Sequence, residues 1–279
     1  MSKPIAPREA RHAILEAGTR AHYEDAAYYD QAYRRRREDV AFYVAEASAR
    51  AAKAGGGGAV LELGAGTGRV AIAMARAGVD VVCVDLVPAM IERAEMRVAK
   101  EPRAVRERLG FKQGDMRSVR LRRRFPLVIA PFNVFMHLYE QRDIERAFAT
   151  VKAHLAPRGR FVFDVMVPDA EALARKPSRV FRAPAVRWPA DGRNYRYSET
   201  FHYDPIRQVQ LVTMIFEDPD DPNNTFITPL THKQFFPVEL EALVHYNGFV
   251  IEDRYGDFER GPLTPESESQ IIVARARSK

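Results

Sequence analysis

Apolar residues follow a repeating pattern between residues 59 and 166, where short apolar runs alternate with longer stretches of helical spacing. After Gly68, for example, Val70, Ala71, Met74 and Ala77 recur as on one face of a helix. The short runs are typical of buried strands and occupy residues 60–63, 81–85, 111–116, 125–130 and 160–165. Strands that alternate with helices indicate a parallel sheet with helices on both faces, so we expect an α/β fold.

The pattern changes on both sides of this core at 59–177. Residues 1–54 favour a helical cap, and Gly55 to Gly58 form a flexible break. Residues 178–235 carry short β-forming runs between turn residues, which predicts an antiparallel insertion. These runs occupy residues 179–182, 195–197, 208–212 and 225–227. Residues 236–279 add a helix and two strands, near 249–251 and 271–274, so we expect a single domain.

A glycine-rich segment follows the first strand. Gly64, Gly66 and Gly68 stand between Val60–Leu63 and the helical stretch. A strand, a glycine turn and a helix in this order form a nucleotide-cofactor loop, because glycine lets the backbone approach a ligand closely. A dinucleotide fingerprint needs a further glycine at position 69, where Arg69 stands. The alternative is a tight turn that binds no ligand.

The second strand ends at Asp85, 21 residues after Gly64. In a βαβ unit this spacing places a carboxylate at the tip of the neighbouring strand, where it can accept hydrogen bonds from ribose hydroxyls. Leu86 would then cover one face of an adenine, and Met90 would face inward from a helix that begins at Pro88. Taken alone, Asp85 could instead cap that helix.

Glu62 and the G-x-G-x-G segment that follows it resemble motif I of the class I S-adenosylmethionine (SAM) methyltransferases. The resemblance implies a Rossmann-like seven-stranded methyltransferase sheet, mostly parallel with the last strand antiparallel. It also implies SAM as the cofactor and S-adenosyl-L-homocysteine (SAH) as the product. The residues that we expect at the cofactor are Tyr29, Glu62, Gly64, Ala65, Gly66, Asp85, Leu86, Met90, Asp115, Met116 and Pro131.

Asp115 and Met116 match a further position of the family. There the family places an acid that meets the adenine amino group, followed by a residue that flanks the ring. The preceding Gly114 also allows a plain surface turn at this place, which is the alternative.

The segment 131–138, after the fourth strand, looks like the family's motif IV. It is closest to the version found in glycine N-methyltransferase-like enzymes of small molecules. By that match Pro131 offers its backbone to the methionine moiety, while Asn133 and His137 lie near the cofactor or the substrate. The N-terminal segment is also similar, and it implies that Tyr29 closes over the cofactor and that a basic residue, Arg37, meets its carboxylate. Helix packing is the alternative for Tyr29.

The chemistry of methyl transfer asks little of the protein, because placing an acceptor in line with a sulfonium supplies most of the rate. An amine acceptor needs its lone pair, whereas a hydroxyl usually needs a general base. His137 is the best base by position, although it could instead pack against the cofactor. His202 and Tyr203, on the insertion, are the second choice beside the substrate. Histidines and acids do not repeat at ligand spacing, so we expect no metal.

The insertion is expected to form the roof of the acceptor pocket, above the loop that holds Asn133 and His137. It is rich in aromatic side chains, including Trp188, Tyr195 and Tyr197, which suit an apolar acceptor and exclude water. The alternative is that these aromatics pack only the insertion's own core.

Composition agrees with an ordinary enzyme. A chain of 279 residues has no apolar run of about 18 residues that could span a membrane. Its start is charged, so we expect no signal peptide. Cys83 is the single cysteine, which excludes an internal disulfide and favours the cytoplasm. A homodimer is compatible with these features.

The net charge of +6 comes with arginine clusters at 34–37 and 120–124. Such patches can bind nucleic acid, but a solvated surface is the simpler interpretation. Nucleic-acid amine methyltransferases carry a polar residue before Pro-Pro-Tyr/Phe, and Ala130 stands at that place. We therefore expect a small-molecule acceptor and no nucleic-acid partner. The alternatives are an RNA or protein methyltransferase and a SAM-binding protein without catalysis.

Overall fold

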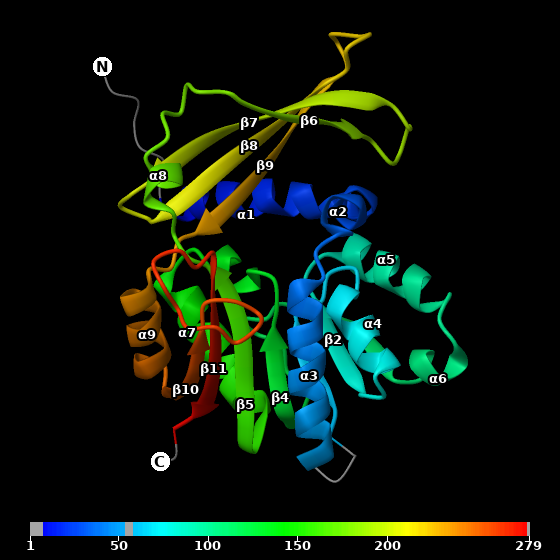
Figure 1. Ribbon diagram of the computed structural model, residues 1–279, viewed down its shortest axis with the longest axis vertical. Helices are drawn as coiled ribbons and strands as arrows, with labels where there is room; N and C mark the ends of the chain where they lie inside the picture. The colour runs from blue at the N-terminus through cyan, green and yellow to red at the C-terminus, as the bar shows by residue number, and fades with distance from the viewer. Residues whose placement is uncertain (1–7, 54–57, 278–279) are drawn as a thin grey trace.

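The computed structural model describes residues 8–53 and 58–277, and its centre is a seven-stranded sheet. The strand order is β10-β11-β5-β4-β1-β2-β3 (Figure 1). Strand β11 runs antiparallel to both β5 and β10, and all other neighbouring strands pair in parallel. The predicted fold class is therefore confirmed. The strands are β1 (Val60–Leu63), β2 (Val81–Asp85), β3 (Leu109–Gln113), β4 (Phe125–Ala130), β5 (Leu155–Met166), β10 (Phe249–Tyr255) and β11 (Ser269–Ala276).

Helices cover both faces of this sheet because successive strand residues point to opposite sides. Val60 packs with α3 and α4 on one face, whereas Leu61 and Leu63 pack with α7 and α9 on the other. The core helices are α3 (Glu38–Lys53), α4 (Arg69–Arg76), α5 (Pro88–Val98), α6 (Arg103–Arg106), α7 (Gln141–His154) and α9 (Pro237–Tyr246), with a 3₁₀ turn, η1 (Val134–His137), after β4.

Four strands of the large sheet differ from their predicted limits, and two of them, β10 and β11, extend beyond the predicted 249–251 and 271–274. β3 ends at Gln113, so Asp115 and Met116 lie in the loop beyond it rather than in the strand. β5 begins at Leu155 and is longer than the predicted 160–165, because its first residues continue directly from α7. The predicted glycine break falls mostly on residues 55–57, which lie outside the described residues, as do residues 1–7 and 54 of the helical cap.

A second, four-stranded antiparallel sheet has the order β6-β7-β8-β9. It lies across two N-terminal helices, which separate it from the large sheet (Figure 1). The predicted runs marked only parts of its long strands, because polar and apolar residues alternate irregularly along them. The elements are α1 (Arg8–Glu24), α2 (Ala26–Tyr33), α8 (Ala170–Leu173), β6 (Phe181–Arg187), β7 (Asn194–Asp204), β8 (Val209–Glu217) and β9 (Thr225–Lys233).

The small sheet is anchored to α2 by aromatic packing. Tyr28 stacks on Trp188 with ring centroids 4.5 Å apart, and it meets the edge of Phe216. Tyr195 and Tyr197 belong to the same cluster. The aromatic residues of the insertion thus form a core of their own with α2. In the described part of the chain, no helix is long and apolar enough to cross a membrane.

Candidate active site

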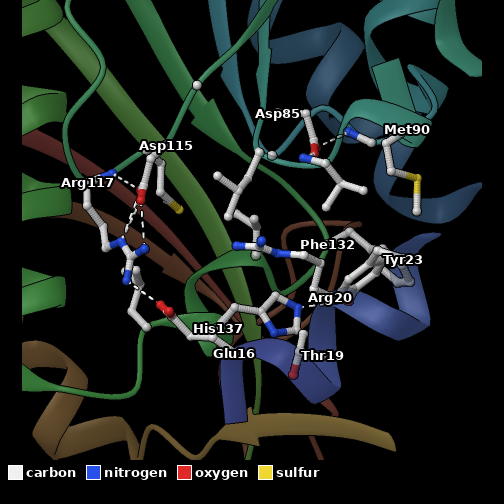
Figure 2. Close-up of a pocket in the computed structure, with 18 of the residues that line it drawn as sticks. Glu16, Thr19, Arg20, Tyr23, Asp85, Met90, Asp115, Arg117, Phe132 and His137 are labelled. Carbon is white, nitrogen blue, oxygen red and sulfur yellow. Dashed lines mark hydrogen bonds and ion pairs between the residues drawn. The ribbon is translucent and has the colours of Figure 1, made fainter. Parts of the chain in front are cut away.

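A cavity lies where the parallel strands end, the edge at which open α/β sheets bind ligands. Loops after β1, β2, β3 and β4 form one side, and α1 closes the other (Figure 2). Its empty space, including the open mouth, is about 1020 Å³. The lining residues are Glu16, Thr19, Arg20, Tyr23, Tyr29, Gly64, Gly66, Asp85, Leu86, Val87, Met90, Gly114, Asp115, Met116, Arg117, Pro131, Phe132, Val134, His137, Leu138 and Tyr139.

The glycine loop requires glycine at its first position. Gly64 has a φ of +70°, and a Cβ there would lie 2.2 Å from Cγ2 of Val134. The amide of Gly64 donates to the carbonyl of Val84 at 2.8 Å, which fixes the loop to β2. The loop therefore brings backbone against η1 in a way that no side chain would allow.

Asp85 ends β2 and holds the neighbouring loops. Its carboxylate accepts hydrogen bonds from the amides of Gly66 at 2.7 Å and Val87 at 2.9 Å. Burial raises the pKa of Asp85, and these two hydrogen bonds oppose that rise. A carboxylate has about four lone-pair positions, so Asp85 retains acceptor capacity on the cavity wall.

Asp115 forms an ion pair with a neighbouring arginine. Arg117 donates to Asp115 through its backbone amide at 2.8 Å and through Nη2 at 2.7 Å, and its Nη1 lies 2.5 Å from Glu16 of α1 (Figure 2). Burial raises the pKa of Asp115, but the hydrogen bonds and charge of Arg117 outweigh it and leave the pKa lowered. Asp115 is thus ionised and linked through Arg117 to α1.

The loop after β4 is strained and held by a buried acid. Phe132 and Asn133 have φ values of 61° and 62°, where side chains other than glycine are strained. Their amides donate to Asp164 at 2.8 and 3.1 Å, and the hydroxyl of Tyr43 donates to Asp164 at 2.6 Å. Asp164, near the end of β5, therefore positions the loop that leads to η1.

His137 lies at the end of η1 with its ring beside α1. Its Nε2 is 2.8 Å from the hydroxyl of Tyr23 (Figure 2). The ring of His232, from β9, has its centroid 5.3 Å away. Burial, and then the charges of His232 and His22, lower the pKa of His137 well below its usual value. His137 is consequently neutral near pH 7, and its Nε2 lies within hydrogen-bond distance of the Tyr23 hydroxyl.

Hydroxyl groups tie α1 in place. The hydroxyl of Tyr139 lies 2.7 Å from Oγ1 of Thr19 and 2.6 Å from Oγ1 of Thr231, and the two threonine hydroxyls also contact each other. These three residues come from α1, the segment after η1, and β9. The contacts fix the wall of the cavity that faces the glycine loop.

Most of the residues predicted at the cofactor line this cavity, and so does His137. Those that line it are Tyr29, Gly64, Gly66, Asp85, Leu86, Met90, Asp115, Met116 and Pro131. Glu62, Ala65 and Asn133 are buried beside it and do not line it. Glu62 sits in β1, where burial raises its pKa to about 8 and the charge of Arg69 partly opposes the rise.

The insertion does not form the expected roof. No cavity-lining residue comes from the described segment 178–235, and α1 forms the wall opposite the glycine loop. His202 and Tyr203 lie on β7, away from the cavity, and His202 is exposed. The physical reason is that α1 occupies the space between the two sheets, so the insertion reaches His137 through β9, by the ring of His232 and the backbone of Thr231.

The basic residue nearest the aromatic end of the cavity is Arg36 rather than Arg37. The guanidinium of Arg36 lies 4.8 Å from the ring centroid of Phe132, whereas Arg37 is exposed. Arg69 also lies over Phe132 and pairs with the buried Asp39 at 2.5 Å.

Sequence reasoning missed the contribution of α1. Glu16, Thr19, Arg20 and Tyr23 recur three or four residues apart and so share one helix face, but nothing in the sequence marks that face as a cavity wall. No group of three metal-ligating side chains occurs among the residues that the structure describes.

Comparison with known proteins adds a family match. Residues 60–159 match a family model described as a methyltransferase domain. A comparison with curated protein sequences finds no match. The fold is similar to that of the CcbJ methyltransferase from Streptomyces caelestis, with 26% sequence identity, a TM-score of 0.71, and coverage of 87% of this chain and 89% of that chain.

More distant structures share the fold. An S-adenosylmethionine-dependent methyltransferase from Clostridium acetobutylicum has 15% identity and a TM-score of 0.70, with coverage of 91% of this chain and 98% of that chain. CalS10, an amino pentose methyltransferase from Micromonospora echinaspora, has 19% identity and a TM-score of 0.60, with coverage of 99% and 100%. At these identities the likeness concerns the fold alone.

Proposed function

We propose that the chain, which is a SAM-dependent methyltransferase, transfers a methyl group to a small-molecule acceptor bound between α1 and η1. The family that the glycine motif predicted is confirmed by the matching domain and the shared fold. The observation that carries the acceptor proposal is a cavity in which Asp85 and the glycine loop face a neutral His137 that is hydrogen-bonded to Tyr23.

The residues along the loops fit the cofactor. Gly64 keeps the backbone of the loop in close contact with Val134, where a Cβ would clash, and Asp85 has acceptor capacity for ribose hydroxyls. Asp115 and Met116 lie on the next loop for the adenine, and Leu86 also lines the cavity. We assign the methionine end to the aromatic side, where Arg36 beside Phe132 supplies a positive charge for its carboxylate.

When bound, SAM supplies an electrophilic methyl group. The protein's contribution is to position the acceptor and handle its proton. Neutral His137 can accept a proton, and the Tyr23 hydroxyl at its Nε2 can donate to it or relay a proton from the acceptor. Thr19, Tyr139 and Thr231 hold α1 so that Tyr23 stays at this distance. An amine or a hydroxyl acceptor suits this arrangement.

We propose that the arginine clusters do not bind nucleic acid. Arg120 donates to the carbonyl of Val119 and to Thr150, and Arg124 donates to the carbonyl of Leu155. Arg120 and Arg124 therefore fasten the approach to β4. A cavity between α1 and the loops likewise favours a small acceptor.

Turnover of a panel of amine and hydroxyl compounds, followed as SAH release, tests the proposal. With an active acceptor, His137→Ala should lower turnover about 100-fold or more, while SAM affinity stays unchanged. Tyr23→Phe should lower turnover by a smaller factor, because His137 remains.

His202→Ala is the matched control, since this histidine is exposed and outside the cavity. It should turn over like the unmodified enzyme. Loss of turnover in His202→Ala, with His137→Ala unaffected, would contradict the assignment.

A further inference from the structure

One cation in the cavity has no partner. Arg20 lines the cavity from α1, and it makes no hydrogen bond or ion pair with the residues that the structure describes. The other lining arginine, Arg117, is neutralised by Asp115 and Glu16. Arg20 is exposed at the cavity wall, so its guanidinium is solvated and available to a ligand.

The position of Arg20 assigns it to the acceptor side. It precedes Tyr23 by three residues, so the two share a helix face and are separated by about 4.5 Å along the axis. Tyr23 contacts His137, whereas Asp85 and the glycine loop lie across the cavity (Figure 2). A molecule with its reacting atom at Tyr23 and His137 would therefore extend along α1 past Arg20.

We propose that Arg20 selects an anionic acceptor, one that carries a carboxylate or a phosphate group near the amine or hydroxyl that is methylated. The inference rests on the proposed function and names its substrate class. A guanidinium presents a fork of donors that matches both kinds of anionic oxygen group. Arg20 makes no competing ion pair within the part of the chain that the structure describes, so its donors are available to such a group.

The first test is independent of turnover. The full chain, saturated with SAH and labelled at arginine with ¹⁵N, is titrated with inorganic phosphate and separately with acetate. The Nε–H signal of Arg20 is identified by its absence in Arg20→Gln. We expect a saturable shift of this signal with at least one anion, and which anion produces it distinguishes phosphate from carboxylate. Arg20→Gln should weaken that anion's calorimetric affinity about 10-fold or more.

Arg106→Gln is the control, because Arg106 is an exposed arginine on α6. It should bind the anion as the unmodified chain does. If SAH itself does not bind, the proposed function fails. If SAH binds and neither anion shifts the Arg20 signal, only the present inference is overturned.

The second test uses matched acceptors that differ only in a carboxylate or its carboxamide. Arg20→Gln should lower kcat/KM for the anionic member about 10-fold or more and leave the neutral member unchanged. An equal loss for both members would overturn the inference. A tenfold loss of SAM affinity in Arg20→Gln would also overturn it, since Arg20 would then serve the cofactor.

Discussion

The two walls of the cavity are built in different ways. The wall that we assign to the cofactor, called the cofactor wall, comes from loops at the ends of adjacent strands, and hydrogen bonds hold it, such as those from Gly66 and Val87 to Asp85. The α1 wall is held by residues far apart in the chain, as Thr19 and Thr231 show. The cofactor wall is therefore a property of a short motif, whereas the α1 wall exists only once the whole fold has assembled.

The largest expected effect on SAM binding comes from adding a side chain at Gly64 in the cofactor wall. Gly64→Ala forces a Cβ against Val134 and requires a positive φ of a residue that resists it. Overpacking and backbone strain together should lower the free energy of unfolding by at least about 2 kcal/mol and abolish SAM binding. Denaturant unfolding and calorimetry measure the two effects.

Gly78→Ala separates the two causes. Its φ is +89°, but a Cβ there meets no atom within 4 Å. In Gly78→Ala the free energy of unfolding should fall only by the cost of the strained backbone, about 1 kcal/mol. Its SAM affinity should stay that of the unmodified chain. If the two variants behave alike, the close approach to Val134 is not what requires glycine at 64.

The sequence predicted the cofactor wall well for the same reason that this wall is local. The spacing from Gly64 to Asp85 is fixed by one strand, one turn and one helix, so the motif carries its own geometry. The α1 wall could not be predicted, because Tyr23 meets His137 across 114 positions of sequence. The aromatic residues of the insertion were likewise ambiguous, since Trp188 suits a pocket and a core equally well.

As the pH falls, the α1 wall should lose stability before the cofactor wall does. Burial lowers the pKa of His22 and of His232 to about 4. Because both folded pKa values lie below the unfolded value of 6.5, the stability that neutral histidine confers is complete above pH 6.5. It is lost as the pH falls toward 4, by up to about 3 kcal/mol for each histidine.

His22→Leu should therefore flatten the fall in melting temperature between pH 6.5 and 4. The exposed His202 offers a control, and His202→Leu should leave the fall in melting temperature between pH 6.5 and 4 unchanged. If the melting temperature of His22→Leu falls between pH 6.5 and 4 as it does in the unmodified chain, the α1 wall is not the pH-sensitive part of the cavity.

The smallest expected effect is that of Tyr43→Phe, a change at a residue that packs beneath the cofactor wall. Tyr43→Phe removes one of three donors to the buried Asp164, and the amides of Phe132 and Asn133 remain. The free energy of unfolding should fall by about 1–2 kcal/mol, with SAM affinity changed only slightly. Denaturant unfolding checks this value, and a loss beyond about 4 kcal/mol would mean that Tyr43 holds the loop almost alone.

The central claim is that the two walls serve different molecules, and SAM affinity measured by calorimetry in Asp85→Ala and His137→Ala tests it most directly. Asp85→Ala loses charged hydrogen bonds to the ribose and to the loop, so its affinity should fall about 10- to 100-fold. His137→Ala should bind SAM as the unmodified chain does. Equal affinities in Asp85→Ala and the unmodified chain, or a comparable loss in His137→Ala, would contradict the account.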